Sequence, residues 1–121
     1  MKIERFEDIE AWKEARTLVK DMYGILGDCG DFGFRNQIQR ASLSIMSNIA
    51  EGFDRHTNKE FIQFLIIARG SCAEVRSLLY AGFDVGYFSE KQCSGFMDSC
   101  LKISMLLNGF IRYLRKSQRK Y

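Results

Sequence analysis

The stretch TNKEFIQFLIIARGSCAEVRSLLYAGFDV at residues 57–85 decides the fold class of this chain. Its apolar and small residues recur every three or four positions, which is the spacing of one face of an α-helix. The residues at this spacing are Phe61, Leu65, Ala68, Cys72, Val75, Leu79 and Gly82. Thr57 and Glu60 form a capping-box pattern, in which each side chain satisfies a backbone donor at a helix start. The stretch therefore predicts a long helix that begins at Thr57 and buries one face.

Three further stretches show the same periodicity, and they predict helices over about residues 8–26, 34–52 and 89–116. Asp8 is the expected N-cap of the first, and Ser89 with Gln92 forms a second capping box. Residues 27–33 hold three glycines and two aspartates and predict a loop. Short breaks between long helices make neighbours antiparallel. We therefore predict one all-α domain over residues 1–121, an antiparallel up-down-up-down four-helix bundle.

The helix over residues 57–85 also predicts self-association. Its first half is apolar on several sides, because the stripe is joined by Ile62, Phe64, Ile66 and Ile67. A helix that is apolar nearly all round has to be covered on more than one side. A small bundle leaves each of its helices one solvated face, so we expect a second copy to supply the cover in a homo-oligomer.

Composition and residue usage exclude several classes of protein. The 121 residues are 46% hydrophobic and 27% charged, as in one soluble domain with one core. Three of residues 1–5 are charged, with no apolar segment behind them, and no apolar run reaches the roughly 20 residues of a membrane span. We expect a cytoplasmic protein that makes no membrane contact.

Residues that carry chemistry are scarce. One histidine, His56, and four cysteines without a CxxC pair cannot form a structural zinc site of usual spacing. Cysteines 72, 93 and 100 lie on apolar stripes and are interpreted as reduced thiols, with a disulfide framework as the alternative. No carboxylate pair, nucleophile–histidine arrangement or phosphate loop can be assembled. We predict no enzyme activity, no catalytic residue, no metal site and no cofactor.

Polar residues at helical spacing form a candidate seam between the second and third helices. The seam consists of Arg40, Ser44, Asn48, Glu51, Arg69 and Glu74, with Ser47 and Ser71 beside them. If the two helices fold back on one another, Arg40 should contact Glu74. One interpretation is a hydrogen-bonded packing network. The alternatives are a contact site for a ligand or RNA and, as a third class, an enzyme site.

The last ten residues are the second candidate. They carry a net charge of +5, with no acid, and include Arg112, Arg115, Lys116, Arg119 and Lys120. Tyr113 and Tyr121 are interleaved as stacking groups. A basic segment of this kind attracts phosphate groups, which predicts nucleic-acid binding. The alternative is a solvated helix end, because the helix dipole favours cations near a C-terminus.

The run FRNQIQRASLSI at residues 34–45, followed by SNIAEG at 47–52, resembles a family signature. The family is the four-helix-bundle proteins encoded in intervening sequences of bacterial 23S ribosomal RNA genes. The match continues at residues 6–15, 59–61, 64–65, 68–71 and 74. This resemblance implies a homopentameric, barrel-like assembly without an established activity. Relatives include an accessory protein of diversity-generating retroelements, which looks like a basic scaffold for a reverse transcriptase and nucleic acid.

Two functional hypotheses follow. The first is a non-enzymatic, oligomeric nucleic-acid-binding or accessory scaffold that uses its basic surface and C-terminal tail. Its partners would be other copies of itself, in a pentamer if the resemblance holds, and RNA, DNA or a nucleic-acid-bound protein such as a reverse transcriptase. The alternative is a structural protein–protein interaction oligomer in which nucleic acid plays no part.

Overall fold

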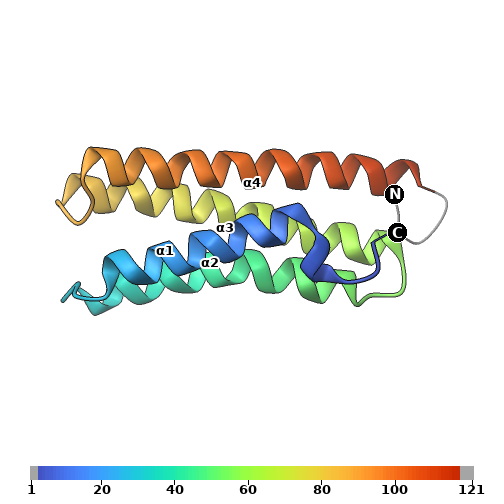
Figure 1. The fold of residues 1–121 in the computed structure, drawn as a ribbon, viewed down its shortest axis with the longest axis horizontal. Coiled ribbons are helices and arrows are strands. Elements are labelled where there is room, and N and C mark those ends of the chain that lie inside the picture. The colour runs from blue at the N-terminus through green and yellow to red at the C-terminus, as the bar shows by residue number, and fades with distance from the viewer. Residues whose placement is uncertain (1–2, 118–121) are drawn as a thin grey trace.

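Four long helices lie side by side along one axis in the computed structural model, which describes residues 3–117 (Figure 1). They are α1 (Glu10–Leu26), α2 (Phe32–Phe53), α3 (Asn58–Asp84) and α4 (Glu90–Lys116), preceded by the single 3-10 turn η1 (Phe6–Asp8). No strand occurs within the described range. The predicted all-α class and the four helices are confirmed.

The helices form a closed ring in chain order. Helix α1 packs against α2, α2 against α3, α3 against α4, and α4 back against α1, while no Cα atoms of the diagonal pairs come within 8 Å of each other among the described residues. Successive helices run in opposite directions, so that α1 and α2 form one side of the bundle and α3 and α4 the other (Figure 1). This is the up-down-up-down order, and it follows from connections too short to cross the bundle.

Two of the predicted helix starts are confirmed at the level of individual hydrogen bonds. The Thr57 hydroxyl accepts from the Glu60 backbone N–H at 3.1 Å. At α4 the capping box is complete, because Ser89 Oγ accepts from the Gln92 N–H at 3.0 Å and Gln92 Oε1 accepts from the Ser89 N–H at 2.9 Å. These side chains satisfy donors that the first helical turn leaves without partners.

The other two starts differ from prediction. Asp8 is not an N-cap, because it lies in η1 and α1 begins after Ile9. The side chain of Ile9 is buried, so packing rather than a polar cap fixes this entry. Helix α2 begins at Phe32 within the predicted loop, since Asp31 Oδ1 caps it by accepting from the Phe34 N–H at 3.1 Å. The buried Ile9 sets the start of α1 and the Asp31 cap sets the start of α2, and the sequence pattern assigned neither role to these residues.

The predicted stripe of α3 is buried along its whole length. Ile62, Phe64 and Ile66 are half-buried, whereas Ile67 is 52% exposed. Helix α3 therefore keeps apolar surface in the single chain, although less than the sequence pattern predicts. No helix within residues 3–117 combines the length and apolar character needed to cross a membrane.

The four cysteines are free thiols. Cys72 and Cys100 are buried between α3 and α4. Burial raises the pKa of Cys72 to about 11 and that of Cys100 to about 12, because a low-dielectric interior disfavours the thiolate. Both side chains therefore act as small apolar residues of the core.

Two glycines set the closest approaches in the core. A Cβ at Gly52 would lie 2.6 Å from Cβ of Phe64, where α2 meets α3. A Cβ at Gly82 would lie 2.5 Å from the ring of Phe88 and 2.8 Å from that of Phe34. These positions have no room for a side chain, so glycine is required there by packing.

The turn before α2 and the turn before α4 meet at one end of the bundle. Tyr87 Oη donates to Asp31 Oδ2 at 2.7 Å, and the rings of Phe34 and Tyr87 lie 5.1 Å apart. The pKa of Asp31 is lowered, because its carboxylate accepts from Tyr87 and from the backbone N–H of Phe34. The pKa of Tyr87 is raised, because its hydroxyl donates to that carboxylate. This contact links two connections that are far apart in the chain.

Candidate nucleic-acid interface

Part of the predicted polar seam is a packed hydrogen-bond network between α2 and α3. Ser71 Oγ lies 2.9 Å from Ser44 Oγ, and Asn48 Nδ2 donates to the same Ser44 oxygen at 2.9 Å. Asn48 also donates to the Ser44 backbone carbonyl at 2.8 Å. Ser71 is buried, and the other two side chains are half-buried. Satisfied polar groups in such a position fix the register of two helices.

The predicted Arg40–Glu74 contact is wrong. Ion pairs within residues 3–117 include Arg5–Asp8, Lys13–Glu10 and Lys102–Glu14, and neither Arg40 nor Glu74 takes part in one there. Arg40 and Glu74 are both exposed and line a shared recess of about 500 Å³ without bonding to each other. An exposed ion pair contributes little free energy compared with two hydrated side chains, so little favours an ion pair between Arg40 and Glu74.

Two further members of the predicted seam lie elsewhere. Arg69 Nη1 donates to Asn108 Oδ1 at 2.8 Å and therefore belongs to the junction of α3 with α4. Residues two apart on a helix point about 200° apart, so Arg69 cannot share the face of Ser71. The Glu51 side chain is exposed and takes no part in the Ser44 network.

The recess beside the seam does not have the geometry of an activated nucleophile. Ser44 lines it, but its hydroxyl is bonded to Asn48 and Ser71, neither of which is a base. Nucleophilic catalysis by serine needs an adjacent group that accepts its proton. The geometry therefore favours packing over catalysis at this position.

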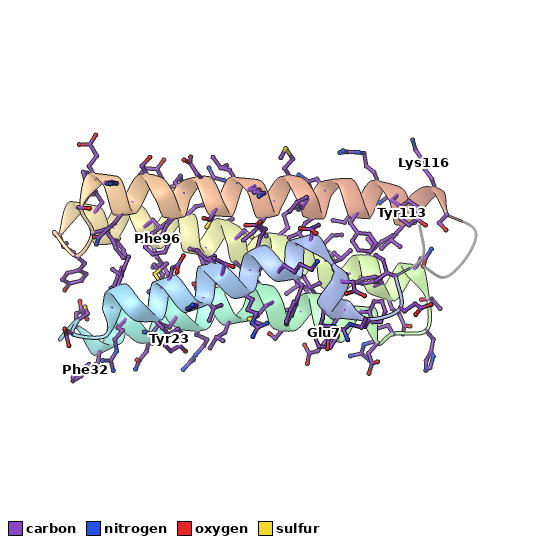
Figure 2. All side chains as sticks on the ribbon, viewed as in Figure 1. Glu7, Tyr23, Phe32, Phe96, Tyr113 and Lys116 are labelled. Atoms are coloured by element: carbon purple, nitrogen blue, oxygen red, sulfur yellow. The ribbon has the colours of Figure 1, made fainter. Side chains whose placement is uncertain are left out.

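Three of the predicted tail residues, Arg112, Arg115 and Lys116, lie on the last turns of α4 and are exposed. Figure 2 shows Lys116 at the outer edge of this end of the bundle. Arg119 and Lys120, together with Tyr121, lie outside the described residues. The described part of the tail is thus a helical surface that projects three cations.

The fold adds two cations to that surface. The start of α3 lies against the end of α4, because Asn58 Nδ2 donates to the backbone carbonyls of Leu114 at 3.3 Å and Ser117 at 3.4 Å. A cleft of about 420 Å³ between these segments is lined by Lys59 and Arg115, among others. Further along α3, Arg69 reaches α4 through its bond to Asn108. We call Lys59, Arg69, Arg112, Arg115 and Lys116 the C-terminal basic surface.

This surface is free of nearby acids on α4. After Asp98 the chain contains no aspartate or glutamate. None of the five cations is in an ion pair with an acid within the described residues. Glu60, at the start of α3, is bonded by the Thr57 hydroxyl at 3.3 Å. From Lys59 to Arg69 the surface extends about 15 Å along α3, at 1.5 Å of rise per residue.

Sequence reasoning missed Lys59 and Arg69 as members of a basic surface. A signal was present, because an up-down-up-down bundle places the start of its third helix beside the end of its fourth. To find the basic surface from the sequence, residues 57–69 have to be considered together with residues 108–116, and not the C-terminal tail alone.

Comparisons with known proteins agree with this architecture. A protein of unknown function from the S23 ribosomal protein family of Bacteroides thetaiotaomicron has a similar crystal structure, with a TM-score of 0.79 and 23% sequence identity. The similarity covers 84% of this chain and 98% of that chain and shows a shared fold. No curated protein matches the sequence. The sequence model of the family described as 23S rRNA-intervening sequence protein matches residues 7–109. The chain therefore belongs to the 23S rRNA-intervening sequence protein family.

Proposed function

We propose that the protein is a non-enzymatic, oligomeric scaffold that binds nucleic acid through the C-terminal basic surface. The observation that supports this proposal is the gathering of Lys59, Arg69, Arg112, Arg115 and Lys116 from two helices onto one acid-poor strip. A strip of that kind is complementary to a phosphate backbone, since each cation placed near a phosphate releases a condensed counterion.

The ligand class is RNA or DNA, free or already bound to a protein such as a reverse transcriptase. Five phosphate contacts on a single strand give a slope of log K against log salt of about −3.5. Affinity should then fall about 100-fold between roughly 50 and 200 mM salt. Association into a pentamer, as the sequence resemblance implies, would multiply the number of contacts along one strand.

The proposal predicts which cations matter. The double variant Arg112→Gln/Arg115→Gln removes two members of the basic surface, and its slope should drop to about −2.1. The matched control Lys13→Gln/Lys102→Gln removes the same charge from cations that are already paired with Glu10 and Glu14. The control should bind as the unmodified protein does, because its cations are engaged by protein carboxylates.

Fluorescence anisotropy with a labelled, unstructured 20-nucleotide RNA at several salt concentrations makes this measurement. Binding that is insensitive to salt, or that weakens equally in both double variants, would overturn the proposal. Light scattering of the same samples gives the number of subunits. A monomer at all protein concentrations would contradict the proposal that the protein is oligomeric.

A second candidate is an oligomeric interaction scaffold that uses protein surfaces alone. Exposed apolar side chains on α3 and α4 favour it, namely Ile67 at 52%, Leu101 at 47% and Met105 at 66% exposure. Large exposed apolar groups on neighbouring helices often mark protein contacts. In this case light scattering would show assembly, and added RNA would not change the measured mass at either low or high salt.

A further inference from the structure

The opposite side of the bundle carries a second acid-poor surface. Residues 32–50 of α2 contain no aspartate or glutamate, and Arg35 lies at the start of this helix. Helix α1 runs antiparallel to α2 (Figure 1) and contributes Arg16, Lys20 and Tyr23, all exposed. We call Arg16, Lys20, Tyr23, Phe32 and Arg35 the α1–α2 face.

This face has two exposed rings, whereas the ring beside the C-terminal basic surface, Tyr113, is 37% exposed and packs against the ring of Phe110. Phe32 is 59% exposed, and Tyr23 is 43% exposed. The guanidinium carbon of Arg35 lies 4.6 Å from the ring centroid of Phe32. Figure 2 shows Tyr23 and Phe32 at the same lower edge of the molecule. A water-exposed ring with a cation stacked on it offers a flat surface and a positive charge together.

Three acids lie close to this face in the sequence, namely Asp21, Asp28 and Asp31. Asp21 lines the groove between α1 and α4, and Lys20 borders the same groove. Asp31 is bonded by Tyr87 at 2.7 Å, at the junction with the turn before α4. Asp28 lies in the turn after α1. The α1–α2 face thus presents three cations and two rings, with Asp21 beside Lys20 at its border with α4 and Asp28 in the turn at one end.

Exposed rings between cations fit unpaired nucleotides. Bases stack on aromatic side chains only when their faces are free, and this stacking tolerates any sequence. A duplex hides those faces and offers only phosphates and groove edges. The α1–α2 face therefore suits a single strand, whereas the C-terminal basic surface suits phosphates in either form.

The two surfaces lie on opposite sides of the ring of helices, because α1 and α2 face away from α3 and α4 (Figure 1). A strand bound to one surface therefore lies across the bundle from the other surface. We infer that the α1–α2 face is a second nucleic-acid site, selective for unpaired bases, so that each chain binds two separate strands. The inference rests on the proposed function in taking nucleic acid as the ligand.

Counting short oligonucleotides per chain tests the inference. At low salt, the unmodified protein should bind two equivalents of a six-nucleotide single-stranded RNA. It should bind one equivalent of a duplex of eight G·C pairs. The variant Phe32→Ala/Arg35→Gln should retain one equivalent of each. Removing Phe32 alone should weaken the affected site about fivefold or more. The control Tyr80→Ala removes a ring that is also 59% exposed but lies on α3, and it should keep both equivalents.

The variants separate failure of this inference from failure of the proposed function. One equivalent of RNA that disappears only in Arg112→Gln/Arg115→Gln would overturn the second site and leave the proposed function intact. One equivalent that disappears only in Phe32→Ala/Arg35→Gln would overturn the proposed use of the C-terminal basic surface. A changed oligomer mass with unchanged RNA stoichiometry in Phe32→Ala/Arg35→Gln would show that the face contacts protein, which also overturns the inference. Circular dichroism melts of each variant establish that it is folded.

Discussion

Replacing Gly52 by alanine tests the closest approach of two helices in this bundle. The added Cβ would lie 2.6 Å from Cβ of Phe64 and 2.8 Å from Cδ1 of Phe61. To reach 3.4 Å, the lower end of ordinary contact, the nearer pair must separate by about 0.8 Å. Cβ of Phe64 is attached directly to the backbone, so it cannot move away by rotation of a side chain. Helix α3 itself has to shift.

The magnitude follows from two opposing terms. Forcing an extra methyl group into a packed core costs about 1–3 kcal/mol. Alanine gains about 1 kcal/mol over glycine in a helix interior, and this is the most it can gain at Gly52, the last residue but one of α2. Because the neighbouring atom is held by the backbone, the cost should lie near the top of its range. We expect a net loss of about 2 kcal/mol, or a decrease in Tm of about 6–10 °C for a chain of this length.

Gly95→Ala is the matched control for this measurement. Gly95 also lies inside a helix, α4, but nothing comes within 4 Å of a Cβ placed there. This variant should be more stable than the unmodified protein by up to about 1 kcal/mol, from helix propensity alone. Thermal melts by circular dichroism at matched protein concentrations compare the three chains, because self-association makes Tm depend on concentration. A Gly52→Ala protein that melts at or above the unmodified chain would refute the packing of α2 against α3 described above.

Three other predictions concern the ends and the interior of the bundle. Tyr87→Phe should lower stability between about pH 5 and 9. The difference should shrink as the pH falls below about 4, because the lowered pKa of Asp31 contributes stability that is lost on protonation of its carboxylate. Cys72 and Cys100, whose pKa values are about 11 and about 12, should stay unmodified by a thiol reagent at about pH 8 and react once guanidinium unfolds the chain. Ser71→Ala should cost about 1–2 kcal/mol in a urea titration, because it removes a hydrogen bond between α2 and α3.

The elements of the fold were predictable because single strong periodicities govern them. Each residue of the α3 stripe is buried, and the starts of α3 and α4 are fixed by side chains that contact backbone only three residues away. Such contacts depend on local sequence and need no knowledge of the rest of the chain. The entry to α1 was not predictable in this way. It depends on the burial of Ile9 and on the packing of Phe6 against Trp12, whose ring centroids lie 5.2 Å apart.

The candidate surfaces were less predictable because they combine residues from different helices. The sequence pattern correctly grouped Ser44, Asn48 and Ser71, whose bonds are short and partly buried. It wrongly added Arg69 to this group, because residues 69–71 are adjacent in sequence but lie on different sides of α3. Long charged side chains at the surface choose partners by small energy differences, and periodicity does not encode that choice.

The distribution of charge also explains how a chain with a net charge of only +3 can offer two basic surfaces. The described ion pairs engage Arg5, Lys13 and Lys102, none of which belongs to either surface. Acids border both surfaces, because Asp8 and Glu10 line a groove with Tyr113 and Asp28 lies in the turn between α1 and α2. Screening in salt confines each charge to a range of about 10 Å, so a strand near either surface experiences the local cations rather than the net charge. Local segregation of charge, and not overall basicity, is therefore the property that the proposed binding requires.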